Sequence, residues 1–130
     1  MAILITGASA GFGEAMCRAF AGAGYYVIGA ARRKEKLDAL QAELGDRFFP
    51  LQMDVSHTES VYQALQSLPE HLQEIDCLIN NAGLGVHALF ADTTEAQFDD
   101  MVAMHLKGPF FLTQALLPLI ADGGRILNVS

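Results

Sequence analysis

Eight residues near the amino terminus have the types and spacing of a phosphate-binding turn: Thr6-Gly7-Ala8-Ser9-Ala10-Gly11-Phe12-Gly13. Glycines let the backbone approach a pyrophosphate, and the free N–H groups and dipole of a following helix favour negative charge. Three glycines are also compatible with a plain tight strand-to-helix connection. An apolar run before the turn and helical apolar spacing after it favour the ligand site. We therefore predict dinucleotide contacts at Gly7, Ser9, Ala10, Gly11, Phe12 and Gly13.

The residues after the second predicted strand decide which dinucleotide fits. A carboxylate at the end of that strand would bind the ribose hydroxyls of NAD and repel a 2′-phosphate. The sequence has Ala31 there, followed by Arg32, Arg33 and Lys34. Because a guanidinium matches a phosphate in charge and bidentate geometry, we predict that Arg32 and Arg33 hold the 2′-phosphate of NADP(H). The other interpretation is a solvated basic helix start, balanced by Glu35 and nearby charges.

Two further groups follow predicted strands. Asp54 could accept a hydrogen bond from the adenine amino group while Val55 packs on the ring, or Asp54 could be an ordinary turn residue. The segment Asn80-Asn81-Ala82-Gly83 combines amides that can bind backbone and ligand with small residues that let a ring lie close. Its alternative is an ordinary Asn-Gly loop. We predict cofactor contacts at Asp54, Val55, Asn81, Ala82 and Gly83.

Alternating strands and helices must position these motifs. We predict strands at 2–6, 26–31, 48–53, 75–80 and 125–129, with helices from the glycine turn to 23 and over 34–44, 57–68, 95–106 and 110–121. Continuous apolar strands separated by helices imply an α/β fold, a doubly wound parallel sheet with strand order 3-2-1-4-5. We expect one dinucleotide-binding domain over residues 1–130.

Two capping patterns and one break set helix boundaries. Ser56 with Glu59, and Thr94 with Gln97, have the S/T-x-x-E/Q spacing of a capping box. Gly108-Pro109 predicts a break between the last two helices.

Composition narrows the class of protein. The chain has 130 residues, 52% of them hydrophobic, and a formal net charge of -7, which argues against nucleic acid and anionic membranes as partners. No apolar run reaches the roughly 18 residues that span a bilayer, and no basic signal-peptide start is visible, so we expect a cytoplasmic protein. Cys17 and Cys77 are too few and too far apart for a metal site or disulfide framework.

These motifs together resemble the short-chain dehydrogenase/reductase family. Thr-Gly-x-x-x-Gly-x-Gly at 6–13, Arg32, Asp-Val at 54–55, Asn-Asn-Ala-Gly at 80–83 and Lys-Gly-Pro-Phe-Phe-Leu-Thr at 107–113 occur in order along the whole chain. The likeness is to the NADP-preferring branch, and within it to bacterial carbonyl reductases and 3-hydroxy acid dehydrogenases. It implies an NADP(H)-dependent oxidoreductase that transfers a hydride between the cofactor and a carbonyl or hydroxyl carbon of a small substrate.

The resemblance also implies a catalytic Ser, a Tyr acid/base and a Lys that lowers the Tyr pKa. On the family pattern, Ser130 precedes the catalytic Ser, and no Tyr follows Tyr62. We therefore expect this chain to supply the cofactor-binding half and to be inactive by itself. The alternatives are a non-catalytic NADP-binding module or pseudoenzyme, and another glycine-rich α/β fold such as a methyltransferase. Arg32 and the segment 80–83 count against the methyltransferase.

The resemblance gives two histidines and one helix a role. His105 replaces a family Asn that serves in a water-linked proton relay; otherwise it could bond the last carbonyls of a helix. His87 lies where substrate would enter, or is simply exposed. The helix over 110–121 is apolar on more than one stripe, which implies a homo-oligomer interface or packing beneath further segments.

Overall fold

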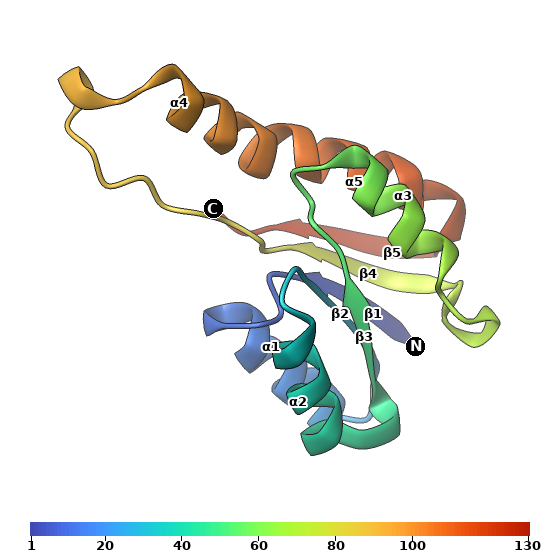
Figure 1. Cartoon of the computed structure of the whole chain (residues 1–130). Helices are drawn as coiled ribbons and strands as arrows, with labels where there is room; N and C mark the ends of the chain where they lie inside the picture. Colours follow the sequence, from blue (N-terminus) through green and yellow to red (C-terminus); the bar gives the residue numbers. More distant parts are fainter.

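Five strands assemble into a parallel sheet, as the alternation of strands and helices predicts. The computed structural model describes all 130 residues, and the sheet has the order β3-β2-β1-β4-β5 (Figure 1). The strands are β1 (Ala2–Thr6), β2 (Tyr26–Ala31), β3 (Phe48–Gln52), β4 (Ile75–Asn80) and β5 (Ile120–Asn128). The α-helices are α1 (Gly11–Gly22), α2 (Lys34–Leu44), α3 (Thr58–Gln66), α4 (Glu95–Val102) and α5 (Gly108–Leu116). The doubly wound fold and its strand order are confirmed.

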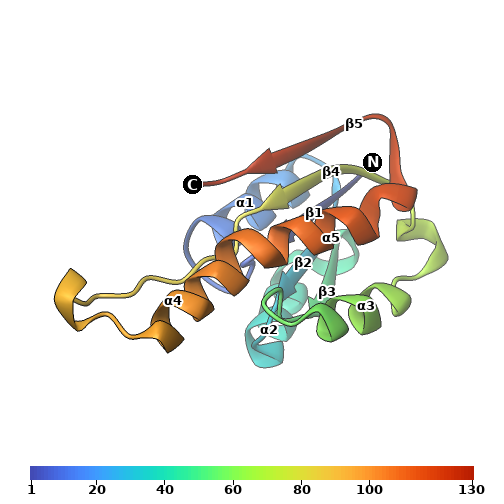
Figure 2. The ribbon, with the colours of Figure 1, turned by 90° about the horizontal axis from the view of Figure 1, so that it is seen from above.

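Helices cover both faces of the sheet, and each face has its own core. Helices α1 and α2 lie on one face, and α3, α4 and α5 lie on the other (Figure 1, Figure 2). Successive residues of β1 point to opposite faces, so Ile3 and Ile5 pack with Leu37 of α2, whereas Leu4 packs on the side of Leu112 of α5. Because both faces are covered there, the central strand β1 is buried along its whole length, whereas the edge strand β5 is mostly exposed.

The strand order reverses at β1. This strand pairs with β2 on one side and with β4 on the other, both in parallel. The connections through α1 and α2 cross one face of the sheet, and those through α3, α4 and α5 cross the other (Figure 1, Figure 2). A crevice therefore opens at the carboxyl ends of the strands, next to β1. Ligands of open α/β sheets bind in such a crevice.

The predicted break at Gly108 and Pro109 is wrong. After α4 the chain makes a wider, π-type turn over Ala103–Lys107 and continues as α5, so α4 and α5 form one rod (Figure 2). Pro109 has no N–H to donate within the rod, and it comes directly after the π-type turn, where the helical hydrogen-bond pattern already changes. The rod is shorter than predicted at its far end, because β5 already begins at Ile120.

The two predicted capping boxes have different outcomes. In α4 the Gln97 N–H donates to Oγ1 of Thr94 at 3.2 Å, and the Thr94 N–H donates to Oε1 of Gln97 at 2.9 Å, which confirms that box. The box of Ser56 and Glu59 is wrong, because the Ser56 hydroxyl donates to Asp54 and no side chain caps α3. Helix α3 also ends at residue 66 instead of 68.

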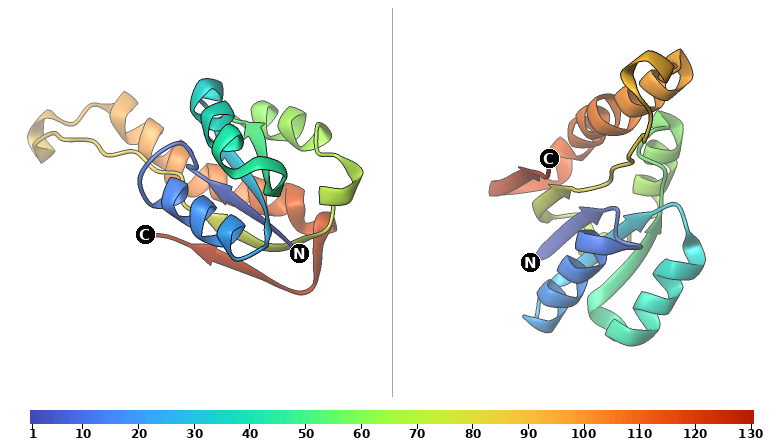
Figure 3. Two further views of the ribbon diagram at one scale, coloured as in Figure 1. Left: turned by 90° about the horizontal axis from the view of Figure 1, so that it is seen from below. Right: turned by 90° about the vertical axis from the view of Figure 1, so that its left-hand side faces the viewer.

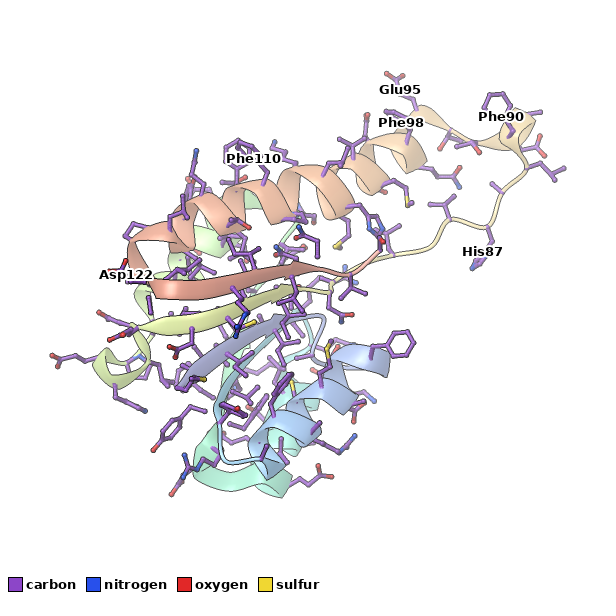
Figure 4. All side chains as sticks on the ribbon, turned by 180° about the vertical axis from the view of Figure 1, so that it is seen from behind. His87, Phe90, Glu95, Phe98, Phe110 and Asp122 are labelled. Atoms are coloured by element: carbon purple, nitrogen blue, oxygen red, sulfur yellow. The ribbon has the colours of Figure 1, made fainter.

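An extended segment between β4 and α4 leaves the body of the molecule (Figure 3). We call residues 84–94 the projecting arm. His87 lies on this arm, and Phe90 at its tip is 99% exposed (Figure 4). Phe98 and Phe110 are exposed along the adjoining rod. The arm and the rod therefore present apolar side chains to solvent.

Neither cysteine is positioned for reactivity. Cys17 is buried in α1, and its burial raises the pKa of the thiol to about 12. Cys77 in β4 is half-buried, and burial raises the pKa of its thiol as well. No three His, Cys, Asp or Glu side chains are grouped closely enough to hold a metal ion. None of the helices combines the length and the apolar character that crossing a bilayer would require.

Candidate cofactor-binding site

A cleft of about 400 Å³ opens at the carboxyl ends of β1, β2, β3 and β4, where the strand order reverses. Its walls contain every predicted cofactor contact except one: Gly7, Ser9, Ala10, Gly11, Phe12, Arg32, Arg33, Asp54, Val55, Asn81, Ala82 and Gly83. Four segments that are distant in sequence therefore meet at a single site. The exception, Gly13, lies behind the wall.

Two glycines let the turn after β1 pack against the end of β4. Gly7 has φ +67°, in the left-handed region that favours glycine, and a Cβ there would lie 2.9 Å from Cα of Ala82. A Cβ on Gly13 would overlap the carbonyl group of Gly7 and approach the Asn81 amide nitrogen at 2.7 Å. Gly13 therefore supports the shape of the turn from behind.

Helix α1 begins at the cleft with backbone donors that no side chain caps. Its N-cap residue, Ala10, is extended and has no polar side-chain atom. The first N–H groups of a helix have no partner within the helix, so those at the start of α1 are free to bind a ligand. The acid in the first turn, Glu14, is paired with Arg18 at 2.8 Å. This helix end therefore suits an anion such as a pyrophosphate.

A single hydroxyl joins the ends of β1 and β4 beneath the cleft. Oγ1 of Thr6 accepts hydrogen bonds from the N–H groups of Asn81 and Ala82, both at 2.9 Å. The Asn81 side chain donates to the Thr6 carbonyl at 3.1 Å. Thr6 is 2% exposed. The side chain of Asn81 thus binds backbone, and its segment forms the floor of the cleft.

Both arginines predicted to hold a phosphate line the cleft. Nη2 of Arg33 lies 3.4 Å from Oγ of Ser9, which belongs to the glycine turn. The carbonyl of Arg32 accepts a hydrogen bond from the Gln52 side chain at 3.2 Å. Strand β2 ends in the buried Ala31, so this strand brings no carboxylate to the site.

The charges at the start of α2 do not neutralise these arginines. Lys34 pairs with Asp38 at 2.7 Å along the helix, whereas neither Arg32 nor Arg33 forms an ion pair. Glu35 makes no ion pair with them either. Two guanidinium groups therefore remain free to meet a doubly charged phosphate.

Asp54 is an ionised group held firmly at the cleft wall. Burial alone would raise the pKa of its carboxyl, but hydrogen bonds from Ser56 and the contact with His57 outweigh burial and lower that pKa below its usual range. Because the folded-state pKa is lowered, the carboxylate contributes to stability at neutral pH. This contribution is lost as the pH falls through the folded-state pKa.

His105 lies at the base of the projecting arm and outside the cleft wall. Its Nε2 is 2.9 Å from the carbonyl oxygen and 3.2 Å from the nitrogen of Leu84, and the tautomer decides which it bonds. A Cβ on Gly83 would lie 2.9 Å from Cε1 of the ring. The alternative role at a helix end is wrong, because the helical rod continues past His105.

A second cavity of about 560 Å³ lies between α5 and β5, next to His105. Asn80 is buried at its edge, and its side-chain NH₂ donates to Oγ1 of Thr113 at 3.3 Å and to Oδ1 of Asn128 at 2.9 Å. The carbonyl oxygen of the Asn80 side chain has no partner. The two cavities share Ala82, so they adjoin at the end of β4.

Two buried methionines line the cleft although sequence reasoning did not select them. Met53 follows β3, and Met104 lies in the π-type turn of the rod. The regular 3.6-residue period could not place Met104, because this residue lies within the wider π-type turn, which departs from that period. Met53 had a usable signal: it directly precedes Asp54 at a strand end.

Comparison with known proteins agrees with this geometry. The family model for short chain dehydrogenase matches residues 1–130. The chain is 41% identical to a serine 3-dehydrogenase of Agrobacterium fabrum. The aligned residues cover 98% of this chain and 52% of that protein. It is 38% identical to the NADP-dependent 3-hydroxy acid dehydrogenase YdfG of Escherichia coli K12, over 99% of this chain and 53% of that protein. The chain therefore belongs to the short-chain dehydrogenase family.

A solved structure matches the fold closely. The closed form of serine dehydrogenase complexed with NADP+ superposes with a TM-score of 0.93 at 37% identity, over 98% of this chain and 53% of that chain.

A further sequence relative is a probable NADP-dependent dehydrogenase of Haemophilus influenzae, which is 38% identical to this chain. The aligned residues cover 98% of this chain and 52% of that protein. The chain thus spans about half the length of the curated relatives it matches.

Proposed function

We propose that this chain binds NADP(H) in the cleft and forms the cofactor-binding half of an oxidoreductase. The observation that carries the proposal is the meeting of an uncapped helix start, a glycine turn and two unpaired arginines in one cleft. Relatives described as NADP-dependent, and a close structural match solved with NADP+, support the choice of dinucleotide.

The residues of the chain divide the work of binding. The first N–H groups of α1 would hold the pyrophosphate, and Arg32 and Arg33 would hold the 2′-phosphate. Asp54 and Val55 would border the adenine, and Ala82 and Gly83 would leave room beside the nicotinamide. When bound, the nicotinamide supplies or accepts the hydride.

We extend the proposal to a small substrate with a carbonyl or hydroxyl carbon. Relatives named for serine and for 3-hydroxy acids support this class. The resemblance gives His105 a part in proton transfer, and its contact with Leu84 through Nε2 leaves Nδ1 for that part. The adjoining cavity, lined by polar side chains of Asn80, Thr113 and Asn128, is where such a substrate would come near the cofactor cleft.

A cofactor titration tests the proposal. We expect wild-type chain to bind NADP+ at least tenfold more tightly than NAD+, and Arg32→Ala to weaken NADP+ binding by about 1.5–3 kcal/mol, the range of a charged hydrogen bond. Lys36→Ala, which removes an exposed cation outside the cleft, is the matched control and should leave the preference intact. Equal affinity for the two dinucleotides in wild type would contradict the proposal.

We also propose self-association through the α4–α5 rod. Helix α5 buries Leu112 and Leu116 in the core and still exposes Phe110 by 63% and Leu117 by 57%. Phe98 and Leu106 extend this exposed stripe along the rod. A stripe of large apolar side chains on a rigid rod is typical of a protein interface.

A further inference from the structure

The two oxygens of the Asp54 carboxylate have different hydrogen-bond partners among the residues after β3. Ser56 donates its N–H at 3.0 Å and its hydroxyl at 2.6 Å to Oδ1 of Asp54. Nδ1 of His57 lies 3.1 Å from Oδ2. Because Oδ1 already accepts two hydrogen bonds, Oδ2 is the oxygen with a lone pair left for a ligand.

The charge of His57 affects how strongly Oδ2 of Asp54 can accept a further hydrogen bond. An ionised carboxylate only accepts hydrogen bonds, so the contact with Oδ2 is a hydrogen bond in the forms of His57 that carry a proton on Nδ1. The Ser56 hydroxyl lies 3.1 Å from the same Nδ1. The His57 side chain is 73% exposed, so solvent reaches its ring. Imidazole gains its charge within the range of about pH 5 to 8, and a charged donor binds a carboxylate more strongly than a neutral one.

We propose that His57 is a positioning residue for adenine: when it gains a proton, it holds Oδ2 of Asp54 more strongly, and the adenine amino group binds less well. The inference rests on the proposed function, because it takes the adenine to lie beside Asp54. It makes recognition of the adenine, as distinct from the phosphates, dependent on pH.

Other charges near the site must be kept apart from this effect. Arg32 shares the cleft wall with Asp54, Glu59 lies in the first turn of α3, and Lys107 precedes Gly108, which packs on the Val55 carbonyl. The 2′-phosphate of NADP+ itself titrates near pH 6. A comparison of two dinucleotides that share the same phosphates and ribose, and differ only in the base, removes the titration of the 2′-phosphate and the charge effects that act equally on both ligands.

The experiment uses NADP+ and its deamino analogue, in which hypoxanthine replaces adenine. Both are titrated into the 130-residue chain at about pH 8 and about pH 5.5, for wild type, His57→Gln and His71→Gln. We expect NADP+ to lose about threefold more affinity than the deamino analogue in wild type, a modest effect because the pair is exposed. His57→Gln should abolish this difference. His71 contacts Tyr26 outside the cleft, so His71→Gln should retain it.

The outcomes separate this inference from the proposed function. If wild type binds NADP+ but the ratio of the two affinities is the same at both pH values, the role of His57 is overturned and the proposed function stands. A ratio that changes with pH equally in His57→Gln also overturns that role. Failure of wild type to bind either dinucleotide overturns the proposed function and this inference with it. Circular dichroism of each variant checks that the fold is retained.

Discussion

At the scale of single residues, Gly13 tests how the glycine turn contributes to folding and to cofactor binding. Gly13→Ala would press a Cβ into the Gly7 carbonyl, so we expect a loss of about 2 kcal/mol in stability and at least tenfold in NADP+ affinity. Gly22 lies in the same helix with open space around it, so Gly22→Ala should change stability by no more than about 1 kcal/mol and leave binding intact. Urea unfolding and cofactor titration measure both.

The sequence was enough to predict that the residues at the strand ends share one site, because the strand order of a parallel sheet brings them together. Gly7, Arg32, Asp54 and Ala82 each follow a different strand, and all four meet in one cleft. The hydrogen-bond partners could not be read in the same way. The contact of His105 with Leu84 depends on a wider helical turn, and no local spacing in the sequence announces it.

At the scale of elements, the capping box of α4 offers a clean test. Thr94→Ala removes the acceptor for the Gln97 N–H, and we expect a loss of about 1 kcal/mol, with faster hydrogen exchange in the first turn of α4. The neighbouring Thr93 bonds to Leu89 of the projecting arm, so Thr93→Ala is the matched control. Equal exchange rates at the start of α4 in the two variants would show that the box does not stabilise this helix.

Helix boundaries were less predictable than strands for identifiable reasons. The Gly108-Pro109 pair predicts a helix break, but the π-type turn over Ala103–Lys107 comes directly before it and the rod stays continuous. Ser56 has the spacing of a cap, but the Asp54 carboxylate competes successfully for its hydroxyl. The first error arises from a change in helical turn that the sequence pattern does not reveal, and the second from a local partner that replaces the expected one.

At the scale of the whole molecule, we expect the 130-residue chain to show no dehydrogenase turnover by itself. A positioned acid or base contributes typically 10²–10⁴-fold to such chemistry, and the Tyr and Lys that the family resemblance implies are not among these residues. NADPH oxidation with ketones, aldehydes and 3-oxo acids is the assay. Turnover that copurifies with the 130-residue chain, confirmed by intact mass, would contradict this expectation.

The same chain should self-associate. β5 pairs only with β4, so its outer edge has free backbone groups, and Ile126 and Leu127 on it are 42% and 46% exposed. An open apolar edge is a template for pairing with another chain. Light scattering should show oligomers that Leu127→Lys reduces. A monomeric wild type at high concentration would count against both the edge and the rod as contact surfaces.

The Thr6 hydroxyl has a consequence for how the cleft meets its ligand. By fixing the amides of Asn81 and Ala82 from within the protein, it orders the floor of the cleft when the chain folds. The conformational entropy of these residues is given up before any ligand arrives, so it does not weaken binding. The floor is therefore a preorganised surface, and any adjustment to a dinucleotide would fall on side chains of the rim such as Arg32 and Arg33, which form no ion pair.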